Sequence, residues 1–275
     1  MSAMATIFVI PGSHACRTGM LLLEHKGIDY RVVELPTGLH PQLVRLLGFP
    51  GRSATPRKVE GGTNAMLASM DRFGTVPAVR IDGERVQTNL ALIDWLDAHY
   101  PEPPLFPAGD EERAQVREAL LWGDEVLQMT ARRLVFAAGL RELDALRGRA
   151  SHGRMGPLLA HNDLWRTAIS QVAGRIVFSA TPAREQALRD ELADQLGVVD
   201  VWLAAGILNG PQLNAADLMI ATSLALLSYV PALEADIEAR PCGALMQRVL
   251  PGPVGPRNTP QSDPAAASGT GVPAA

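Results

Sequence analysis

A proline-rich segment, PEPPLFPAGD at residues 101–110, is the feature that most constrains the fold of this chain. Proline has no backbone N–H and interrupts helices and sheet interiors, so such a segment is typical of a domain boundary. We therefore predict two domains, residues 1–100 and 111–250, joined by a linker over residues 101–110. The 275-residue length favours the same division. Residues 251–275 are low in complexity and are expected to be a disordered tail.

The first half begins with a strand, a helix and a second strand. Residues 6–10 form a short apolar run, and residues 16–26 carry apolar side chains at helical spacing up to Gly27, a typical helix stop. The sequence IDYRVVEL, residues 28–35, then predicts another strand. A connection this short favours parallel, neighbouring strands with a right-handed crossover.

The rest of the first half predicts a helix, a hairpin and a helix. Residues 40–49 show a brief helical pattern, and TVPAVRIDGERVQ, residues 75–87, predicts two strands joined at an Asp-Gly turn. Residues 88–100 predict an amphipathic helix. The turn-rich stretch at 50–74 is long for a connection in a small domain, and such stretches are usually mobile or functional.

The second half, residues 111–250, is helical in pattern throughout, with breaks expected at 148–156, 174–182 and 208–213. No segment in it alternates between apolar and polar residues as a half-buried strand does. We predict an all-α domain.

The composition of the chain excludes several classes of function. The net charge is −4 and the pI about 5.9, so the chain lacks the basic footprint expected of a nucleic-acid-binding protein. Two cysteines, Cys16 and Cys242, make neither a disulfide framework nor a four-thiolate zinc site. His152 and His161 have no third ligand at suitable spacing, so no metal is expected. With no apolar run of about 18 residues and no leader-like start, we expect a cytoplasmic protein without membrane partners.

The residues Ser13-His14-Ala15-Cys16 have the C-x-x-C spacing of thioredoxin-like proteins, with serine in the first place. Ser13 is a preferred residue type for a helix N-cap. Cys16, one turn into the helix, is expected to be a buried, inert thiol. His14 is expected to be a solvent-facing loop residue rather than a base. Arg17 is expected to be a surface ion-pair partner, with contact to an anionic substrate as the alternative.

The element order resembles that of the cytosolic glutathione transferases, and four motifs carry the resemblance. TVPAV is similar to the Val-Pro motif of that family, in which the proline is cis, and QTNLALIDWL is similar to its Gln/Glu-Ser segment. PEPPLFP resembles its interdomain linker. LNAADLMIATSL resembles its helix-capping segment, and Asn214 with Asp217 also fits a structural capping box. The resemblance implies a thioredoxin-like N-terminal domain followed by the helical glutathione transferase C-terminal domain.

The resemblance also implies a site and a reaction. Glutathione would be the thiol co-substrate, conjugated to a hydrophobic electrophile, and a homodimer is expected from the family. Ser13 falls where serine classes carry a catalytic hydroxyl that donates to the thiolate. Val76 and Pro77 would pair with the thiol peptide in strand fashion, and Gln87 and Thr88 would hold its γ-glutamyl end. Ser13 as helix cap and Ser13 as thiolate donor both remain open.

Other interpretations compete with this one. A non-catalytic binding or interaction protein on the same scaffold is the second hypothesis, and a thiol-disulfide reductase using an exposed Cys16 of lowered pKa is the third.

Residues 51–74 replace the short connection of the family, which leaves the identity of the thiol open. Aromatic and Met side chains would line a co-substrate pocket or, more often, a core; they are Trp122, Met129, Met155, Trp165 and Trp202. A small basic cluster in the replaced connection comprises Arg52, Arg57 and Lys58.

Overall fold

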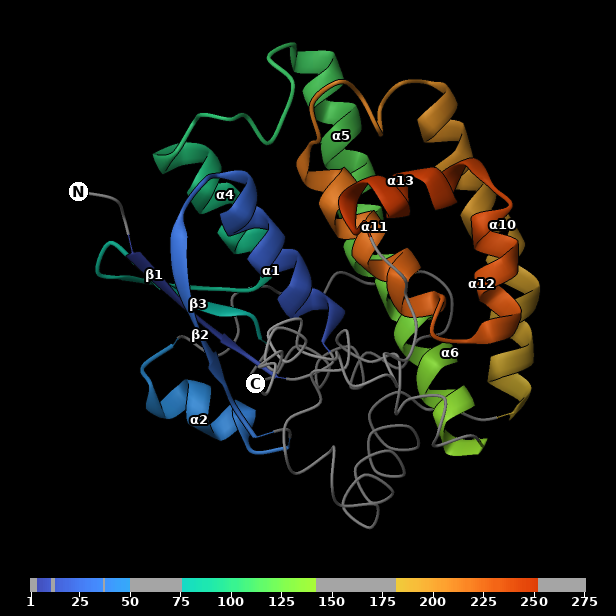
Figure 1. Ribbon diagram of the computed structural model, residues 1–275, viewed down its shortest axis with the longest axis horizontal. Helices are drawn as coiled ribbons and strands as arrows, with labels where there is room; N and C mark the ends of the chain where they lie inside the picture. Colours follow the sequence, from blue (N-terminus) through green and yellow to red (C-terminus); the bar gives the residue numbers. More distant parts are fainter. Residues whose placement is uncertain (1–3, 11–12, 37, 50–75, 142–181, 252–275) are drawn as a thin grey trace, which may run out of the picture.

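The structure is a computed structural model that describes residues 4–10, 13–36, 38–49, 76–141 and 182–251. A small sheet with its helices lies beside a second group made of helices (Figure 1). The elements of the first group are β1 (Met4–Val9), α1 (His14–His25), β2 (Asp29–Glu34), α2 (His40–Leu46), β3 (Ala78–Ile81), β4 (Glu84–Gln87) and α4 (Asn89–His99). Those of the second are α5 (Asp110–Trp122), the π-helical turn η1 (Gly123–Leu127), α6 (Gln128–Arg141), α10 (Pro182–Ala204), α11 (Ala215–Leu227), α12 (Pro231–Glu238) and α13 (Pro241–Val249).

The sheet has the strand order β2-β1-β3-β4. β1 pairs with β2 in parallel, and β3 is antiparallel to both β1 and β4. The parallel pair and the hairpin predicted from the sequence are therefore confirmed. The hairpin turns at Asp82 and Gly83, whose φ angles of 49° and 82° are the left-handed values that a two-residue turn of this kind needs. With α2 on the side of the sheet away from α1 and α4 (Figure 1), this is the predicted thioredoxin-like domain.

The described part of the second half is helical, as predicted. The expected break at 208–213 lies between α10 and α11. Two short breaks that the sequence analysis missed precede α12 and α13, and each of these helices begins at a proline, Pro231 and Pro241. Proline suits the first helical position because its missing N–H would have no partner there. The predictions for residues 50–74, for 148–156, for 174–182 and for the tail at 251–275 lie outside the described residues, apart from Pro182 and Pro251.

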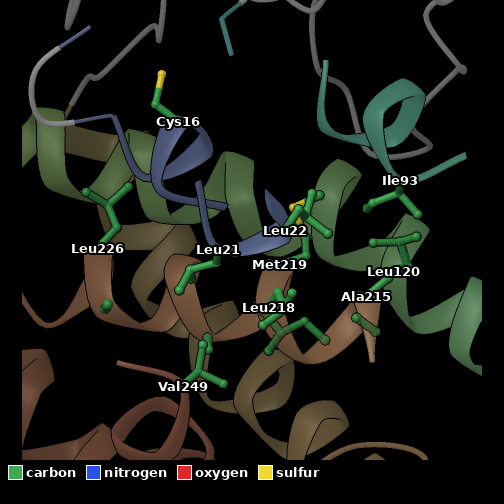
Figure 2. Packing of buried hydrophobic residues seen from close by; sticks show 14 of the residues in the cluster. Cys16, Leu21, Leu22, Ile93, Leu120, Ala215, Leu218, Met219, Leu226 and Val249 are labelled. Atoms are coloured by element: carbon green, nitrogen blue, oxygen red, sulfur yellow. The ribbon is translucent and has the colours of Figure 1, made fainter. Parts of the chain in front are cut away.

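Helix α11 is the centre of the core. All thirteen of its residues are buried, which is the mark of a helix surrounded by other elements. Figure 2 shows Leu21 and Leu22 of α1 close to Leu218 and Met219 of α11. In the same interface the buried hydroxyl oxygens of Thr18 and Thr222 are 2.7 Å apart, a hydrogen bond between the sheet-bearing half and the helical half. The two halves therefore share one continuous core.

The predicted capping box at the start of α11 is confirmed. The Asn214 side chain accepts hydrogen bonds from the backbone N–H groups of Ala216 and Asp217, at 2.9 and 3.1 Å. The Asp217 carboxylate accepts in return from the N–H of Asn214 at 2.9 Å and from that of Asn209 at 2.7 Å. Burial raises the pKa of Asp217, although these two backbone donors oppose the rise.

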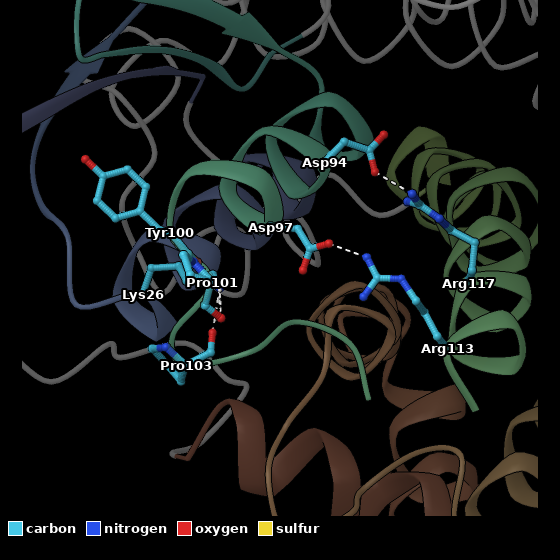
Figure 3. A network of polar contacts seen from close by, with 8 residues as sticks. All are labelled: Lys26, Asp94, Asp97, Tyr100, Pro101, Pro103, Arg113 and Arg117. Carbon is cyan, nitrogen blue, oxygen red and sulfur yellow. Dashed lines mark hydrogen bonds and ion pairs between the residues drawn. The ribbon is translucent and has the colours of Figure 1, made fainter. Parts of the chain in front are cut away.

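Lys26 binds the backbone of the proline-rich segment (Figure 3). Its ammonium group donates to the carbonyl oxygens of Tyr100 and Pro103, each at 2.6 Å. The residue is only 6% exposed, and burial lowers the pKa of its ammonium group. A further ion pair, Asp94 of α4 with Arg117 of α5 at 2.6 Å, spans the same connection. Lys26 thus fixes the linker to α1, and the Asp94–Arg117 pair joins the helices that precede and follow the linker. The sequence pattern indicated neither contact.

Replacing Lys26 with methionine is expected to lower the free energy of unfolding by about 2–3 kcal/mol, because two partly buried carbonyl groups lose a charged donor. Urea unfolding followed by circular dichroism measures this loss. The matched control is Arg31→Met on the exposed face of β2, for which a change within about 0.5 kcal/mol is expected. Equal effects of the two substitutions would show that the ammonium–carbonyl contacts do not stabilise the linker.

Candidate functional site

Ser13 is the N-cap of α1. Its backbone is extended, and its hydroxyl oxygen accepts a hydrogen bond from the Cys16 N–H at 3.2 Å. The cap interpretation is therefore confirmed. A serine hydroxyl has one proton to donate and two lone pairs to accept with, so capping occupies a lone pair and not the proton. The Ser13 side chain also makes a hydrogen bond with the Cys16 thiol. The first turn of α1 also presents the positive end of the helix dipole at this point.

Cys16 is a buried thiol, 3% exposed. Burial raises its pKa to about 11, against smaller opposing effects of the Ser13 side chain, the Ile10 backbone and the charge of Arg132. The thiol is therefore protonated at neutral pH. The reductase hypothesis required an exposed Cys16 with a lowered pKa, and it is wrong.

His14 was expected in a solvent-facing loop, and this prediction is also wrong. Helix α1 begins at His14, two residues earlier than the apolar pattern indicated, so the side chain lies on the helix and is only 8% exposed. Its Nε2 atom has no hydrogen-bond partner among the residues described. Burial, aided by the charge of Arg132, lowers the pKa of His14 well below its usual value of 6.5, so the ring is neutral.

The lowered pKa of His14 makes stability depend on pH. Above about pH 6.5 the imidazole is neutral in both the folded and the unfolded chain, and its contribution is fully present. Below pH 6.5 the unfolded chain takes up a proton that the folded chain does not, so the free energy of unfolding falls by up to about 1.4 kcal/mol per pH unit. Urea unfolding at pH 7.5, 6.5 and 5.5 measures this slope. A His14→Gln variant should show a shallower fall, whereas parallel curves would contradict the assignment.

The Val76–Pro77 peptide is cis, as the resemblance implied. In the described part of the chain, no hydrogen bond is recorded for the N–H or the C=O of Val76. Gly19 of α1 packs directly on Pro77: a Cβ atom at Gly19 would lie 2.8 Å from the proline Cγ. A residue without a side chain is therefore needed where α1 meets this loop. The sequence analysis missed Gly19, although a glycine inside a helical pattern is a signal of close approach.

Thr88 lies beside the same loop. Its N–H donates to the Pro77 C=O at 3.1 Å, and its hydroxyl caps α4 by accepting from the Ala91 N–H at 3.2 Å. Its φ of 81° and ψ of 154° lie in a region that only glycine adopts readily, at a cost of about 1–3 kcal/mol. Such backbone strain clusters at functional sites. Gln87, the last residue of β4, is buried and makes polar contact.

Asn89, which the sequence analysis did not single out, joins α4 to α1. Its side-chain amide donates to the backbone C=O of Ala15 in the first turn of α1, at 2.9 Å. Through Asn89, Thr88 and Gly19, the structure brings the start of α1, the cis-proline loop and the start of α4 to one end of the sheet. This arrangement places Ser13 and Thr88 near one another and is called the α1–α4 site below.

Arg17 and the aromatic residues were predicted to be structural. Arg17 pairs with Glu24 at 3.4 Å on the surface, as expected. The rings of Trp122 and Trp202 meet edge-on, with centroids 5.1 Å apart, and both are packed against the core. The other candidates lie outside the described residues; they are Arg52, Arg57, Lys58, His152, Met155, His161 and Trp165.

The described part of the chain also bears on metal binding and on membrane spanning. Among these residues no group of three or more His, Cys, Asp or Glu side chains is placed to hold a metal ion. None of the helices described is long and apolar enough to span a bilayer.

Comparison with known proteins identifies the N-terminal domain and the fold. Residues 7–104 match the family model "Glutathione S-transferase, N-terminal domain". A search of curated proteins finds no match. Solved structures that superpose on the chain include a GST-like protein from Pseudomonas syringae, with a TM-score of 0.57, 17% identity, and coverage of 91% of this chain and 67% of the other.

Two further structures are similar over most of both chains. The glutathione S-transferase from Sinorhizobium meliloti gives a TM-score of 0.53 at 17% identity, covering 91% of this chain and 90% of that one. A glutathione S-transferase of Ceriporiopsis subvermispora in complex with glutathione gives 0.56 at 18% identity, covering 90% and 98%. At this identity the structures support the fold, and the family model supports the assignment of the N-terminal domain. The chain therefore carries a glutathione S-transferase N-terminal domain over residues 7–104, and its fold is that of the solved glutathione S-transferases.

Proposed function

We propose that this protein is a glutathione transferase-like enzyme that conjugates a low-molecular-weight thiol, glutathione, to an electrophilic small molecule. The observation that carries the proposal is the position of Ser13 in the α1–α4 site. Capping does not use its hydroxyl proton, the residue stands at the positive end of α1, and the cis-proline loop adjoins the same helix.

The chemistry needs a thiolate. A free thiol has a pKa of about 8.5, so only a few per cent is ionised at neutral pH. A hydroxyl that donates to the sulfur, together with a helix N-terminus, favours the charged form and lowers the pKa of the bound thiol. Ser13 would supply that donor. The thiolate sulfur then attacks the electrophile. Ser13 itself forms no covalent bond to the electrophile.

The remaining residues would hold the thiol peptide. In the described part of the chain the N–H and C=O of Val76 have no recorded partner, which suits strand-like pairing with an extended peptide beside Pro77. Thr88, at the N-terminus of α4, would receive the γ-glutamyl carboxylate, with Gln87 next to it. The complex of the Ceriporiopsis protein with glutathione supports this choice of thiol.

Several wider statements belong to the same proposal. We infer a homodimer that acts in cytoplasmic detoxification, with a hydrophobic electrophile as second substrate. The domain limits proposed are residues 1–100 and 111–250, with the linker at 101–110. A non-catalytic binding protein on this scaffold is the competing function.

Calorimetry with glutathione, followed by a turnover assay with chlorodinitrobenzene, tests the proposal. Binding at millimolar or lower concentration together with formation of the conjugate is expected. Binding without turnover would favour the non-catalytic alternative. No binding at millimolar glutathione would exclude glutathione as the thiol.

A further inference from the structure

Asn89 is the first residue of α4, and its side chain does not cap that helix. Asparagine is common at helix starts because its side chain accepts from free backbone N–H groups, but here Thr88 does so by accepting from the Ala91 N–H. The Asn89 amide instead bonds to α1, where its Nδ2 atom donates to the Ala15 carbonyl at 2.9 Å. Capping therefore does not explain this residue.

The contact leaves a buried polar atom without a partner. Asn89 is only 4% exposed, and its Oδ1 atom has no hydrogen-bond partner among the residues described. The Ala15 carbonyl lies inside α1, where it already accepts from the N–H four residues on. A buried polar atom without a partner destabilises a fold, and an apolar side chain of similar size would avoid it. Stability alone thus does not account for an asparagine at this position.

Hydrogen bonds join α1 and α4 at both ends. At their C-terminal ends Lys26 donates to the Tyr100 carbonyl at 2.6 Å, and at their N-terminal ends Asn89 donates to the first turn of α1. The two helices are therefore parallel, and Figure 1 shows them on the same side of the sheet. The Asn89 bond is the one at the end that carries the α1–α4 site, two residues from Ser13 along the chain.

The span between the two helix starts matters for the reaction proposed above. Glutathione would be held by its γ-glutamyl end at the start of α4, and its sulfur must then reach the Ser13 hydroxyl on α1. A misplacement of about 1 Å can cost about 100-fold in rate. Apolar packing between helices has no preferred direction, whereas a hydrogen bond is specific in distance and angle. The Asn89 bond therefore sets this span more closely than packing does.

We propose that Asn89 is a positioning residue of this enzyme, which fixes the start of α1 against the start of α4 through the Ala15 carbonyl. The inference rests on the function proposed above and adds a buried residue that acts through α1. Its role is to align the sulfur of a thiol held at α4 with Ser13. It governs turnover and the ionisation of the bound thiol, and it leaves the contacts that hold the thiol peptide in place.

Asn89→Leu tests this proposal, because leucine is similar in size and cannot donate a hydrogen bond. Three quantities are measured: the Kd of glutathione by calorimetry, kcat/KM for chlorodinitrobenzene at saturating glutathione, and the pKa of the bound thiol from its thiolate absorbance. We expect kcat/KM to fall at least about tenfold. The bound thiol pKa should rise toward that of free glutathione, and the Kd should change far less than kcat/KM.

Lys26→Met is the matched control, since it removes the hydrogen bonds at the other end of the same two helices. It should leave kcat/KM and the bound thiol pKa of the folded protein unchanged, although it lowers stability. Asn89→Gln keeps an amide donor on a longer side chain and should recover part of the activity. Asn89→Ala removes the amide without adding apolar bulk, so the test stands even where the leucine variant does not fold.

The outcomes separate the two proposals. A lowered kcat/KM with a raised bound thiol pKa in Asn89→Leu, absent from Lys26→Met, supports the positioning role. Equal losses in the two variants overturn it, since the bond would then serve only the packing of α4 on α1. Wild-type values in Asn89→Leu also overturn it, and both of these results leave the transferase function standing. No glutathione binding by folded wild-type protein contradicts the proposed function itself.

Discussion

Replacing Ser13 with alanine is expected to lower kcat/KM for glutathione conjugation about 100-fold. The substitution removes the hydroxyl donor at the positive end of α1, and loss of one preorganised donor to a developing or stabilised anion costs about 10²–10³ in rate. The same substitution removes a helix cap, which costs about 1 kcal/mol of stability. Steady-state kinetics with glutathione and chlorodinitrobenzene, beside urea unfolding, separate the two effects.

A second helix cap gives the matched control for Ser13. Asn214 caps α11, far from the α1–α4 site in sequence, and accepts from two backbone N–H groups. Asn214→Ala should lose stability with kcat/KM unchanged for the folded protein. Ser13→Thr keeps both the cap and the hydroxyl and should retain most of the activity. Equal activities of Ser13→Ala and wild type would show that Ser13 is only a helix cap and contributes nothing to catalysis.

Asp217→Ala is expected to have the largest effect on stability, a loss of about 3–5 kcal/mol. The Asp217 side chain is 0% exposed, and the substitution leaves the buried N–H of Asn214 and the partly buried N–H of Asn209 without their acceptor. Removing one member of a buried charged hydrogen-bond set carries a cost of this size. Because α11 packs on α1, the loss should appear as one cooperative transition of the described core.

Urea unfolding measures the effect of Asp217→Ala. Asp236→Ala, on the exposed side of α12, is the matched control and should change the free energy of unfolding by no more than about 0.5 kcal/mol. A loss below 1 kcal/mol for Asp217→Ala would show that the capping box contributes little to the core.

The sequence predicted the elements whose signals are local. Alternating and helical periodicity, the Asp82-Gly83 turn and the spacing of Asn214 and Asp217 each depend on neighbouring residues. They predicted the sheet, the hairpin, the all-helical half and the capping box. The Val-Pro motif, through the family resemblance, also predicted the cis peptide.

The parts that were missed depend on contacts between distant residues. Lys26 reaches the linker carbonyls of residues 100–103, and Asn89 reaches Ala15, which no periodicity encodes. His14 was misplaced because polar residues before an apolar run look like a loop, whereas the helix begins as soon as Ser13 caps it.

The pKa of the bound glutathione thiol is the most direct test of the proposed mechanism. Ultraviolet absorbance of the thiolate, followed against pH in the glutathione complex, measures it for wild type and Ser13→Ala. The two protein thiols do not interfere, because burial raises the pKa of Cys16 to about 11 and that of Cys242 to about 12. The mechanism predicts a bound thiol pKa well below that of free glutathione in wild type, and a rise toward the free value in Ser13→Ala. A bound thiol with the pKa of free glutathione in both proteins would contradict it.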